Sequence, residues 1–212
     1  LIVKLNLFSY EITLNRIKKE FDDNRYKENA LIIQNVQPFT MTSAARVDTL
    51  IDAVDYIYRS QIEGSFVECG VWKGGSTMAM LLKLNELGDK SRDIYLYDTF
   101  SGMSAPSAED RKIGGEKAQE KYFRTLREDG TSDWCNAPIE EVEQNVRGTG
   151  YFSDKIHFVK GDVCETLVNE TKPSKIALLR LDTDWYESTK FELEMLYPLL
   201  NVGGVLIIDD YG

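Results

Sequence analysis

The sequence predicts an α/β fold built around a parallel sheet, on the basis of three stretches of the chain. Two short apolar runs, Ile176–Leu181 and Val205–Ile208, flank a segment whose apolar residues have helical spacing. Such a pattern is typical of a βαβ unit, in which the crossover is right-handed and the two strands are parallel. A third strand-like run at Phe66 and Val67 is followed by a glycine-rich turn and another helical segment. Strands that alternate with helices in this way favour a parallel sheet.

Length and composition narrow the class of protein. A chain of 212 residues fits one large domain with a single core. The net charge of −10 argues against a nucleic-acid partner. No apolar run approaches the roughly 18 residues that a membrane span needs, and the first residues, LIVKLNLF, lack a signal-peptide cleavage pattern. Cys69, Cys135 and Cys164 lack CxxC spacing, which favours a reducing, cytoplasmic location and argues against a zinc site.

The first part of the chain predicts helices. Residues 1–37 are polar with scattered apolar positions, and we interpret them as an N-terminal helical extension of a domain that spans 38–212. Thr42 or Ser43 is a good N-cap for the next helix, which follows a loop at Thr40–Thr42. The apolar stripe of this amphipathic helix consists of Val47, Leu50, Ile51, Val54 and Ile57 or Tyr58.

The stretch SFVECGVWKGGST predicts a strand, a glycine-rich turn and a helix that runs to about Leu87. Glycines let the backbone approach a ligand closely, and the N-terminus of a helix offers free N–H groups. Ser76 stands where a P-loop has its lysine, and Trp72 stands where a dinucleotide fold has its second glycine. The remaining interpretation is an acidic glycine loop in which Glu68 faces a cationic, phosphate-free ligand. The alternative is an ordinary tight turn with a solvated glutamate.

A second strand, with Ile94 and Leu96, ends at Asp98. An acid at this position accepts hydrogen bonds from a ribose diol in many nucleotide-binding folds, although it could equally cap the next turn. Residues 101–137 form a long polar segment, which predicts a partly helical lid with Phe123 and Trp134 as an apolar wall. A disordered insertion is the alternative.

A further helix and strand follow this segment. Pro138 begins a helix, because proline is favoured in a first turn. Lys155–Lys160 predicts a third strand, which holds the only histidine, His157, in a structural rather than a catalytic position. Asp162 follows this strand and either accepts a hydrogen bond from an adenine amino group or closes a turn.

Carboxylates follow both apolar runs of the last third of the chain. The first run ends in Asp182 and Asp184, and the second ends in Asp209 and Asp210. Since parallel strands end at the same edge of a sheet, we expect these four aspartates to converge on one crevice. Like charges this close raise each other's pKa, and a hard divalent cation offsets the repulsion. The alternative is that they are caps at strand ends. The helix between the runs has the apolar positions Phe191, Leu193, Leu196, Tyr197 and Leu200.

The stretches FVECGVWKGGST, YDTFSGM, LLRLDTDWYEST and LYPLLNVGGVLIIDDYG, in this order and spacing, resemble the macrocin O-methyltransferase family. Members of that family methylate sugar hydroxyls on macrolide and aminocoumarin antibiotics. The resemblance runs from about Thr40 to Gly212 and implies a class I methyltransferase fold, a Rossmann-like, doubly wound, mostly parallel sheet with helices on both faces. It also implies S-adenosylmethionine and Mg²⁺ as cofactors. The family continues with another helix and a closing antiparallel strand pair, so we expect the C-terminal strands to be missing from this chain.

The resemblance also implies residue roles. Asp182, Asp209 and Asp210 would bind Mg²⁺, and Asp184 would be the general base. Thr183 stands where the family often has glycine. The residues implied for the S-adenosylmethionine pocket are Thr40, Met41, Thr42, Glu68, Gly70, Ser76, Asp98, Thr99, Phe100 and Asp162. The acceptor is expected to be a small molecule with a vicinal diol, because two adjacent oxygens can chelate the metal. Apolar positions in the N-terminal region leave a homo-oligomer possible.

Three other functions compete with this interpretation. A nicotinamide-dependent oxidoreductase is disfavoured by Trp72 and by the absence of an evident Tyr–Lys catalytic pair. A non-catalytic cofactor-binding module is the second. A metal-dependent sugar-nucleotide enzyme that uses Asp182-Thr183-Asp184 as a DxD motif is the third, and Glu68 argues against a diphosphate nearby.

Overall fold

The computed structural model describes residues 26–108, 110, 117–170 and 172–209. Its strands form one five-stranded sheet in the order β3-β2-β1-β4-β5, and every neighbouring pair is parallel. The strands are β1 (Ser65–Cys69), β2 (Ile94–Asp98), β3 (Ile156–Lys160), β4 (Ile176–Leu181) and β5 (Leu200–Ile208). The predicted parallel α/β sheet is therefore confirmed.

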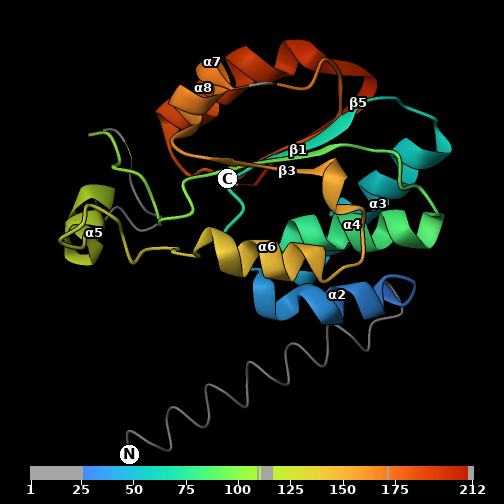
Figure 1. Cartoon of the computed structure of the whole chain (residues 1–212), viewed down its shortest axis with the longest axis horizontal. Coiled ribbons are helices and arrows are strands. Elements are labelled where there is room, and N and C mark those ends of the chain that lie inside the picture. The colour runs from blue at the N-terminus through green and yellow to red at the C-terminus, as the bar shows by residue number, and fades with distance from the viewer. Residues whose placement is uncertain (1–25, 109, 111–116, 171, 210–212) are drawn as a thin grey trace, which may run out of the picture.

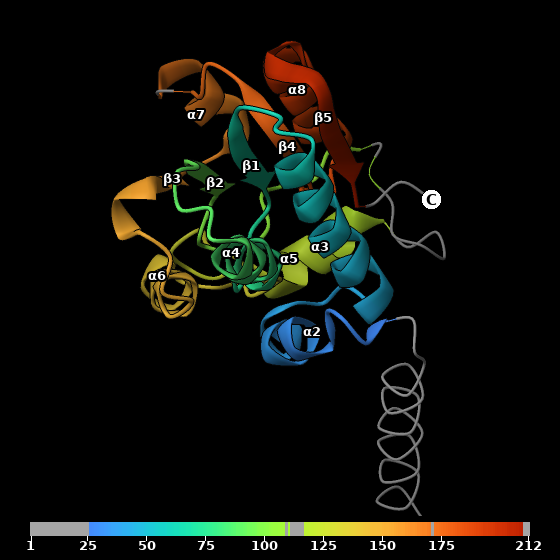
Figure 2. The same cartoon turned by 90° about the vertical axis from the view of Figure 1, so that its right-hand side faces the viewer.

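Helices cover both faces of the sheet, as a doubly wound fold requires (Figures 1 and 2). One face carries α2 (Ala30–Val36), α3 (Ala44–Arg59), α4 (Gly75–Leu87) and α6 (Ile139–Arg147), and the other carries α7 (Val163–Asn169) and α8 (Tyr186–Leu196). Helix α5 (Ala118–Thr125) lies outside these layers (Figure 1). The short 3-10 helices are η2 (Gln37–Phe39), η3 (Ser153–Lys155) and η4 (Tyr197–Leu199).

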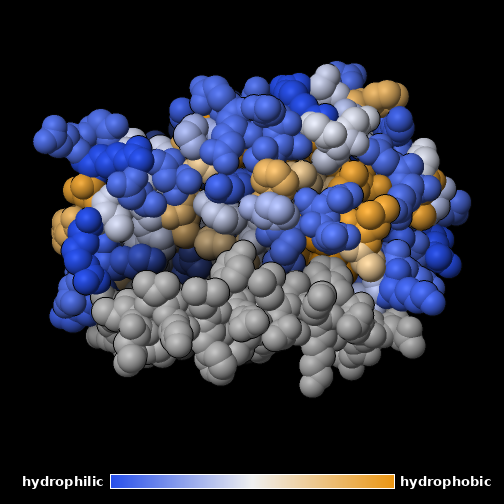
Figure 3. Space-filling view, turned by 90° about the horizontal axis from the view of Figure 1, so that it is seen from below, coloured by the Kyte–Doolittle hydropathy of each residue, from blue (hydrophilic) through white to orange (hydrophobic). Residues whose placement is uncertain are grey.

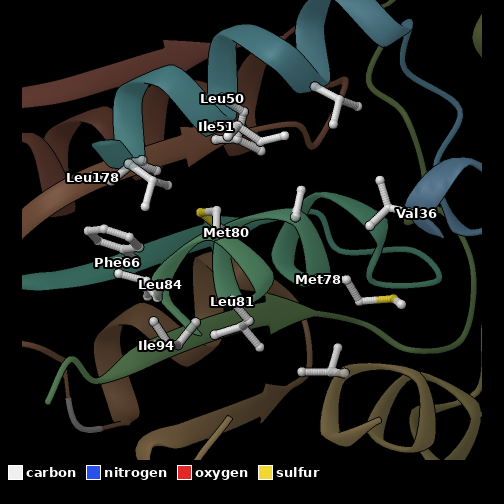
Figure 4. Packing of buried hydrophobic residues seen from close by; sticks show 14 of the residues in the cluster. Val36, Leu50, Ile51, Phe66, Met78, Met80, Leu81, Leu84, Ile94 and Leu178 are labelled. Atoms are coloured by element: carbon white, nitrogen blue, oxygen red, sulfur yellow. The ribbon is translucent and has the colours of Figure 1, made fainter. Parts of the chain in front are cut away.

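The larger buried cluster lies between the sheet and α3 and α4 (Figure 4). Phe66, Ile94 and Leu178 come from three neighbouring strands, and Leu81 and Leu84 come from α4. Helix α4 is apolar on nearly all sides because it is enclosed by the sheet and by other helices. Its central position fixes the glycine turn that precedes it.

The second cluster lies on the opposite face, under α7 and α8. Successive strand residues point to opposite faces, so Val67 and Leu179 belong to this cluster while their neighbours Phe66 and Leu178 belong to the first. Both faces of the central strands are thus buried, which explains their nearly continuous apolar sequences.

Helix α2 shares the core of the rest of the domain. Ile33 and Val36 are fully buried in the same cluster as α3 and α4. The boundary expected at residue 37 and the extension over residues 1–37 stay predictions, because residues 1–25 lie outside the described residues.

Two details of the predicted helices are settled by the structure. Ser43 is the N-cap of α3, where its hydroxyl oxygen accepts a hydrogen bond from the Arg46 N–H. The apolar stripe of α8 was expected to include Tyr197 and Leu200, and this was wrong. The α-helix ends at Leu196 and passes into the 3-10 helix η4, where Pro198 has no N–H to donate to an α-helical hydrogen bond.

Polar residues cover most of the described part of the one face that the space-filling view shows (Figure 3). On the visible part of the face in Figure 3, hydrophilic residues predominate and apolar residues gather in patches. No described helix has both the length and the apolar character that a membrane crossing requires. The homo-oligomer that the sequence left possible stays untested.

Candidate active site

A cavity of about 460 Å³ opens at the carboxyl ends of the central strands. Glu68 and Gly70 line it at the end of β1, Asp98 at the end of β2, and Asp182 after β4. The chain leaves β1 toward β2 and β3 on one side and returns to β4 and β5 on the other. The cavity therefore lies at the topological switch point, where open α/β sheets bind ligands, and its volume suits a small molecule.

Two glycines of the turn after β1 let protein segments approach each other. Gly70 has a φ of +82°, and a Cβ added to it would lie 2.0 Å from the backbone oxygen of Asp182. A Cβ on Gly75 would lie 2.5 Å from the backbone oxygen of Phe39. The glycines were expected to admit a ligand, but the close approach in the structure is to neighbouring backbone. They bring the end of β4 and the Phe39–Thr42 loop against the turn, and so shape the cavity.

All three residues of the Thr40–Thr42 loop line the cavity, as the resemblance implied. The Thr42 N–H donates to the hydroxyl oxygen of Thr40 at 3.2 Å. The Thr42 hydroxyl oxygen is buried and, among the described residues, has no hydrogen-bond partner. A buried polar atom without a protein partner indicates a missing water or ligand. The assignment of this loop to S-adenosylmethionine stays a prediction.

Asp98 fastens the glycine turn to the end of β2. One carboxylate oxygen accepts hydrogen bonds from the N–H groups of Val71 (2.7 Å) and Trp72 (3.1 Å), and the other accepts from the Phe100 N–H (2.7 Å). This is the capping role that the sequence left open. Asp98 and Thr99 also line the cavity, so contact with a ribose stays a prediction, whereas the buried ring of Phe100 packs near Phe158.

Asp162 and Ser76 lie at helix N-termini on the cavity wall. Asp162 caps α7, with one carboxylate oxygen accepting from the Cys164 N–H at 2.8 Å. Ser76 is buried in the first turn of α4, next to Gly75. Asp162 thus closes a turn, and its proposed contact with adenine is untested.

Arg180 is the centre of the acidic cluster, and sequence reasoning missed it. Its side chain is only 4% exposed, and one guanidinium nitrogen lies 2.8 Å from both Glu68 and Asp182. The other nitrogen lies 3.3 Å from Asp209. Burial by itself lowers the pKa of Arg180, but the three carboxylates outweigh it and raise that pKa, which keeps the guanidinium charged. Glu68 is buried and also accepts from the Thr77 hydroxyl, so the alternative of a solvated glutamate was wrong.

Three of the four aspartates predicted to converge lie within the described residues. Asp182 and Asp209 share the guanidinium of Arg180, and Asp184 lines the same cavity. Asp210 lies outside the described residues. Asp184 has a φ of +64°, an uncommon conformation for a residue other than glycine. Strained backbone of this kind is often found at functional sites.

Glu192 is a second residue that was not predicted. It is fully buried on α8, where one carboxyl oxygen accepts from the Thr183 hydroxyl at 3.2 Å and the other has no partner among the described residues. Burial raises the pKa of Glu192 to about 8, with the charge of Asp182 adding to the effect. The signal was available, because Glu192 lies four residues before Leu196 and shares its inward helix face.

The first part of the 101–137 segment is fastened to the turn before α8. The Trp185 ring donates its N–H to the Ser104 carbonyl at 3.1 Å, and Asp110 accepts from the Tyr186 N–H at 3.0 Å. Trp134 packs edge-on against Trp185 with ring centroids 5.5 Å apart. Phe123 and Trp134 were expected to form an apolar wall of the cavity, which was wrong, because neither residue lines it and Phe123 is 68% exposed.

His157 lies near the N-terminal end of β3, away from the cavity at the carboxyl ends of the strands. Its ring nitrogen lies 2.9 Å from an Asp93 oxygen, and its ring stacks on Tyr95. These contacts agree with a structural histidine.

Comparison with known proteins identifies the family. A family model described as Macrocin-O-methyltransferase (TylF) matches residues 5–212. The chain belongs to this family. It is 34% identical over 172 residues to the 8-demethyl-8-(2,3-dimethoxy-alpha-L-rhamnosyl)-tetracenomycin-C 4'-O-methyltransferase of Streptomyces olivaceus, covering 81% of this chain and 62% of that protein. It is 29% identical to the demethyldecarbamoylnovobiocin O-methyltransferase of Streptomyces niveus, covering 95% of this chain and 74% of the relative.

Solved structures of related proteins have the same fold. The O-methyltransferase NovP is 29% identical and superposes with a TM-score of 0.67, covering 82% of this chain and 67% of that one. A calicheamicin methyltransferase superposes with a TM-score of 0.62 over 94% of this chain and 77% of its own, and at 19% identity this supports the fold alone. The predicted class I methyltransferase fold is confirmed. The chain spans less than two thirds of the length of the Streptomyces olivaceus relative.

The cavity residues fit the methyl donor that the TylF family implies. S-adenosylmethionine needs hydrogen-bond partners for its polar ends and tolerates carboxylates near its positive charges. The cavity offers Asp98 and Asp162 on one wall, and two of its residues, Thr42 and Tyr97, have buried hydroxyls without partners in the described part of the chain.

The donor atoms near Arg180 fit a hard cation in type. Asp182 and Asp209 supply carboxylate oxygens, which Mg²⁺ prefers, and both lie against the same guanidinium. Within the described residues, no group of three or more potential metal ligands is present. Asp182 and Asp209 are two of the three expected ligands, Asp210 lies outside the described residues, and the Mg²⁺ site stays a prediction.

Proposed function

We propose that this chain is an S-adenosylmethionine-dependent O-methyltransferase that acts on a hydroxyl of a sugar or other vicinal diol in a small natural product. One observation carries the proposal. The Thr40–Thr42 loop, Glu68, Asp98, Asp162 and Asp184, which are far apart in the sequence, line one cavity at the switch point of the sheet. Membership of the TylF family supports the same chemistry.

Different walls of the cavity would contact different parts of the methyl donor. S-adenosylmethionine supplies the methyl group when bound. The Thr40–Thr42 loop and Ser76 lie together at the N-terminus of α4, where free N–H groups favour the carboxylate of a methionine end. Asp98 and Asp162 lie at the ends of β2 and β3, where they would contact the ribose and the adenine.

Asp184 is the proposed general base. It lies on the cavity wall two residues after Asp182, and the uncommon backbone conformation fixes where its side chain begins. An aspartate in water has a pKa near 3.9, so it is a weak base, and a positioned base contributes roughly 10²–10⁴-fold. Alignment of the acceptor oxygen with the methyl group contributes about 7–11 kcal/mol. Alignment is therefore the larger effect.

We assign Mg²⁺ to Asp182, Asp209 and Asp210. When bound, the ion would stabilise negative charge on the acceptor hydroxyl as a Lewis acid. The residues of the chain orient the acceptor. Trp185 lies on the cavity wall beside Asp184, where its ring offers an apolar surface to a sugar or an aglycone.

The proposed partners follow from charge and composition. The net charge of −10 supports a small-molecule acceptor rather than a nucleic acid. The free cysteines Cys69, Cys135 and Cys164 agree with a reducing, cytoplasmic location, which stays a prediction.

The experiment is a methyl-transfer assay with isotopically labelled S-adenosylmethionine and a panel of glycosides that carry vicinal diols. We expect labelled methyl on a sugar oxygen, detected by mass spectrometry. Matched glycosides that lack one hydroxyl of the diol should be poor acceptors. Absence of transfer to every diol by a protein that binds S-adenosylmethionine would contradict the proposal.

A further inference from the structure

Asp209 contacts two arginines from different parts of the fold. The same carboxylate oxygen lies 3.3 Å from Arg180 on β4 and 3.5 Å from Arg46 in the first turn of α3. Asp182 lies 2.8 Å from Arg180. The two described carboxylates assigned to Mg²⁺ therefore already have cationic partners, and the proposed mechanism uses neither arginine.

Each arginine offsets part of the negative charge in this cluster. Glu68, Asp182 and Asp209 contribute three negative charges, while Arg180 and Arg46 contribute two positive charges. If one guanidinium left the cluster, its net charge would become more negative by one unit, and the attraction for a divalent cation would increase.

The two arginines differ in how strongly the carboxylate cluster holds them. Arg180 is 4% exposed, and its additional ion pair with Glu68 holds it in place. Arg46 is 58% exposed, and its long 3.5 Å contact with Asp209 is the only ion pair the described residues give it. An exposed side chain with one weak ion pair is bound by little more than thermal energy.

We propose that Arg46 is an exchangeable counter-cation of the metal site: it occupies Asp209 until a divalent cation takes its place. Arg180 is the permanent counter-cation, which holds Asp182 and Asp209 together whether or not the metal is bound. This inference rests on the metal site of the proposed function and adds a residue that sets its affinity.

The strength of the displaced ion pair gives the size of the effect. A metal ion that takes the place of Arg46 must break the exposed Arg46–Asp209 contact. The stability of an exposed pair corresponds to a roughly twofold to fivefold change in affinity at most. Removal of the Arg46 charge should tighten metal binding by this factor.

The test is calorimetric titration of Mg²⁺, and separately Mn²⁺, into metal-free protein without S-adenosylmethionine or acceptor. The variant is Arg46→Gln, which removes the charge but keeps a polar side chain on an exposed helix position. The matched control is Arg59→Gln at the other end of α3, where Arg59 pairs with Asp55 on the surface. We expect Arg46→Gln to bind metal roughly twofold to fivefold more tightly than wild type, and Arg59→Gln to bind like wild type.

Ionic strength sharpens the test. Arg46 is exposed, so added salt should reduce the difference between Arg46→Gln and wild type. Equal or weaker metal binding by Arg46→Gln than by wild type would overturn the exchange.

Asp209→Asn separates failure of the exchange from failure of the site itself. It should abolish most of the metal affinity in either background. If Asp209→Asn binds Mg²⁺ like wild type, the proposed metal site is wrong, and the exchange falls with it. The methyl-transfer proposal has its own assay and stands or falls separately.

Discussion

The two edges of the sheet each hold an arginine with little exposure, and the two arginines have different surroundings. At the carboxyl edge, Arg180 contacts three carboxylates. At the amino edge, Arg92 contacts one carboxylate, Asp89 at 2.9 Å, and donates to the backbone carbonyls of Ile62 and Gly64 at 2.9 and 3.0 Å. Arg92 ties loops together, whereas Arg180 gathers acids from three strands.

The two edges also differ in how far cations and hydrogen bonds balance their carboxylates. At the amino edge, burial raises the pKa of Asp89 and of Asp93, but hydrogen bonds from Ser91 and Arg92 in one case and from His157 in the other lower each pKa below its usual value. At the carboxyl edge, the carboxylates outnumber their cations. The amino edge is therefore electrostatically satisfied, and the carboxyl edge keeps the surplus negative charge that a cationic ligand needs.

The largest effect should come from Asp184→Asn. Asp184 lines the cavity, and its loss as a base should lower kcat about 10²–10⁴-fold while leaving S-adenosylmethionine affinity nearly unchanged. The matched control at the amino edge is Asp93→Asn, which should leave kcat at the wild-type value. Steady-state kinetics and calorimetry measure both quantities. Wild-type turnover by Asp184→Asn would mean that Asp184 is not the base.

The next effect concerns stability. Arg180→Met leaves Glu68 buried without its cation, so we expect the free energy of unfolding to fall by about 3–5 kcal/mol. Arg92→Met leaves two backbone carbonyls and a less buried acid without their hydrogen-bond donor. We expect the free energy of unfolding to fall by about 1–3 kcal/mol. Urea unfolding at neutral pH measures both values.

A second substitution tests the reason for this difference. Glu68→Gln in the Arg180→Met background removes the unpaired buried charge and should recover part of the stability. A greater loss of stability in Arg92→Met than in Arg180→Met would show that the unpaired Glu68 carboxylate is not the main cause of destabilisation.

The last effect is a pH dependence of stability, which is small for each pH unit. Burial raises the pKa of Glu192 from the ordinary 4.5 to about 8. Between these values the folded state keeps a proton that the unfolded state has released, so stability decreases as the pH rises, by up to about 1.4 kcal/mol per pH unit. Below this window both states are protonated, and the stability is fully present.

Glu192→Gln is the matched variant, since glutamine still accepts the Thr183 hydrogen bond and does not titrate. The difference in unfolding free energy between wild type and Glu192→Gln should therefore change across the window. A constant difference would mean that Glu192 titrates normally in the folded protein.

The sheet and its acids could be predicted because their signals are local. Short apolar runs mark the strands, and an acid directly after a parallel strand must lie at the carboxyl edge, as for Asp98 and Asp182. The pairing of these acids could not be predicted from spacing, because it depends on the order of strands. Glu68 and Arg180 are 112 positions apart and meet only because β1 pairs with β4.

Arg180 nevertheless left a trace in the sequence. It is the one charged residue in the apolar run Ile176–Leu181, and a charge in a buried strand must have a partner. The same reasoning applies to Glu192 on the inward face of α8. The role of the glycines was harder to foresee. Gly70 and Gly75 lack the Cβ that would clash with the backbone of Asp182 and of Phe39, and these residues are distant in the sequence.

The most direct test of the account is calorimetric titration of S-adenosylmethionine and of NAD⁺ into the protein, first with Mg²⁺ and then with EDTA. The cavity at the carboxyl edge should bind S-adenosylmethionine in both conditions, because the proposed mechanism assigns Mg²⁺ to the acceptor and not to the methyl donor, and it should not bind NAD⁺. Binding of NAD⁺ in place of S-adenosylmethionine would contradict the account and favour the oxidoreductase interpretation.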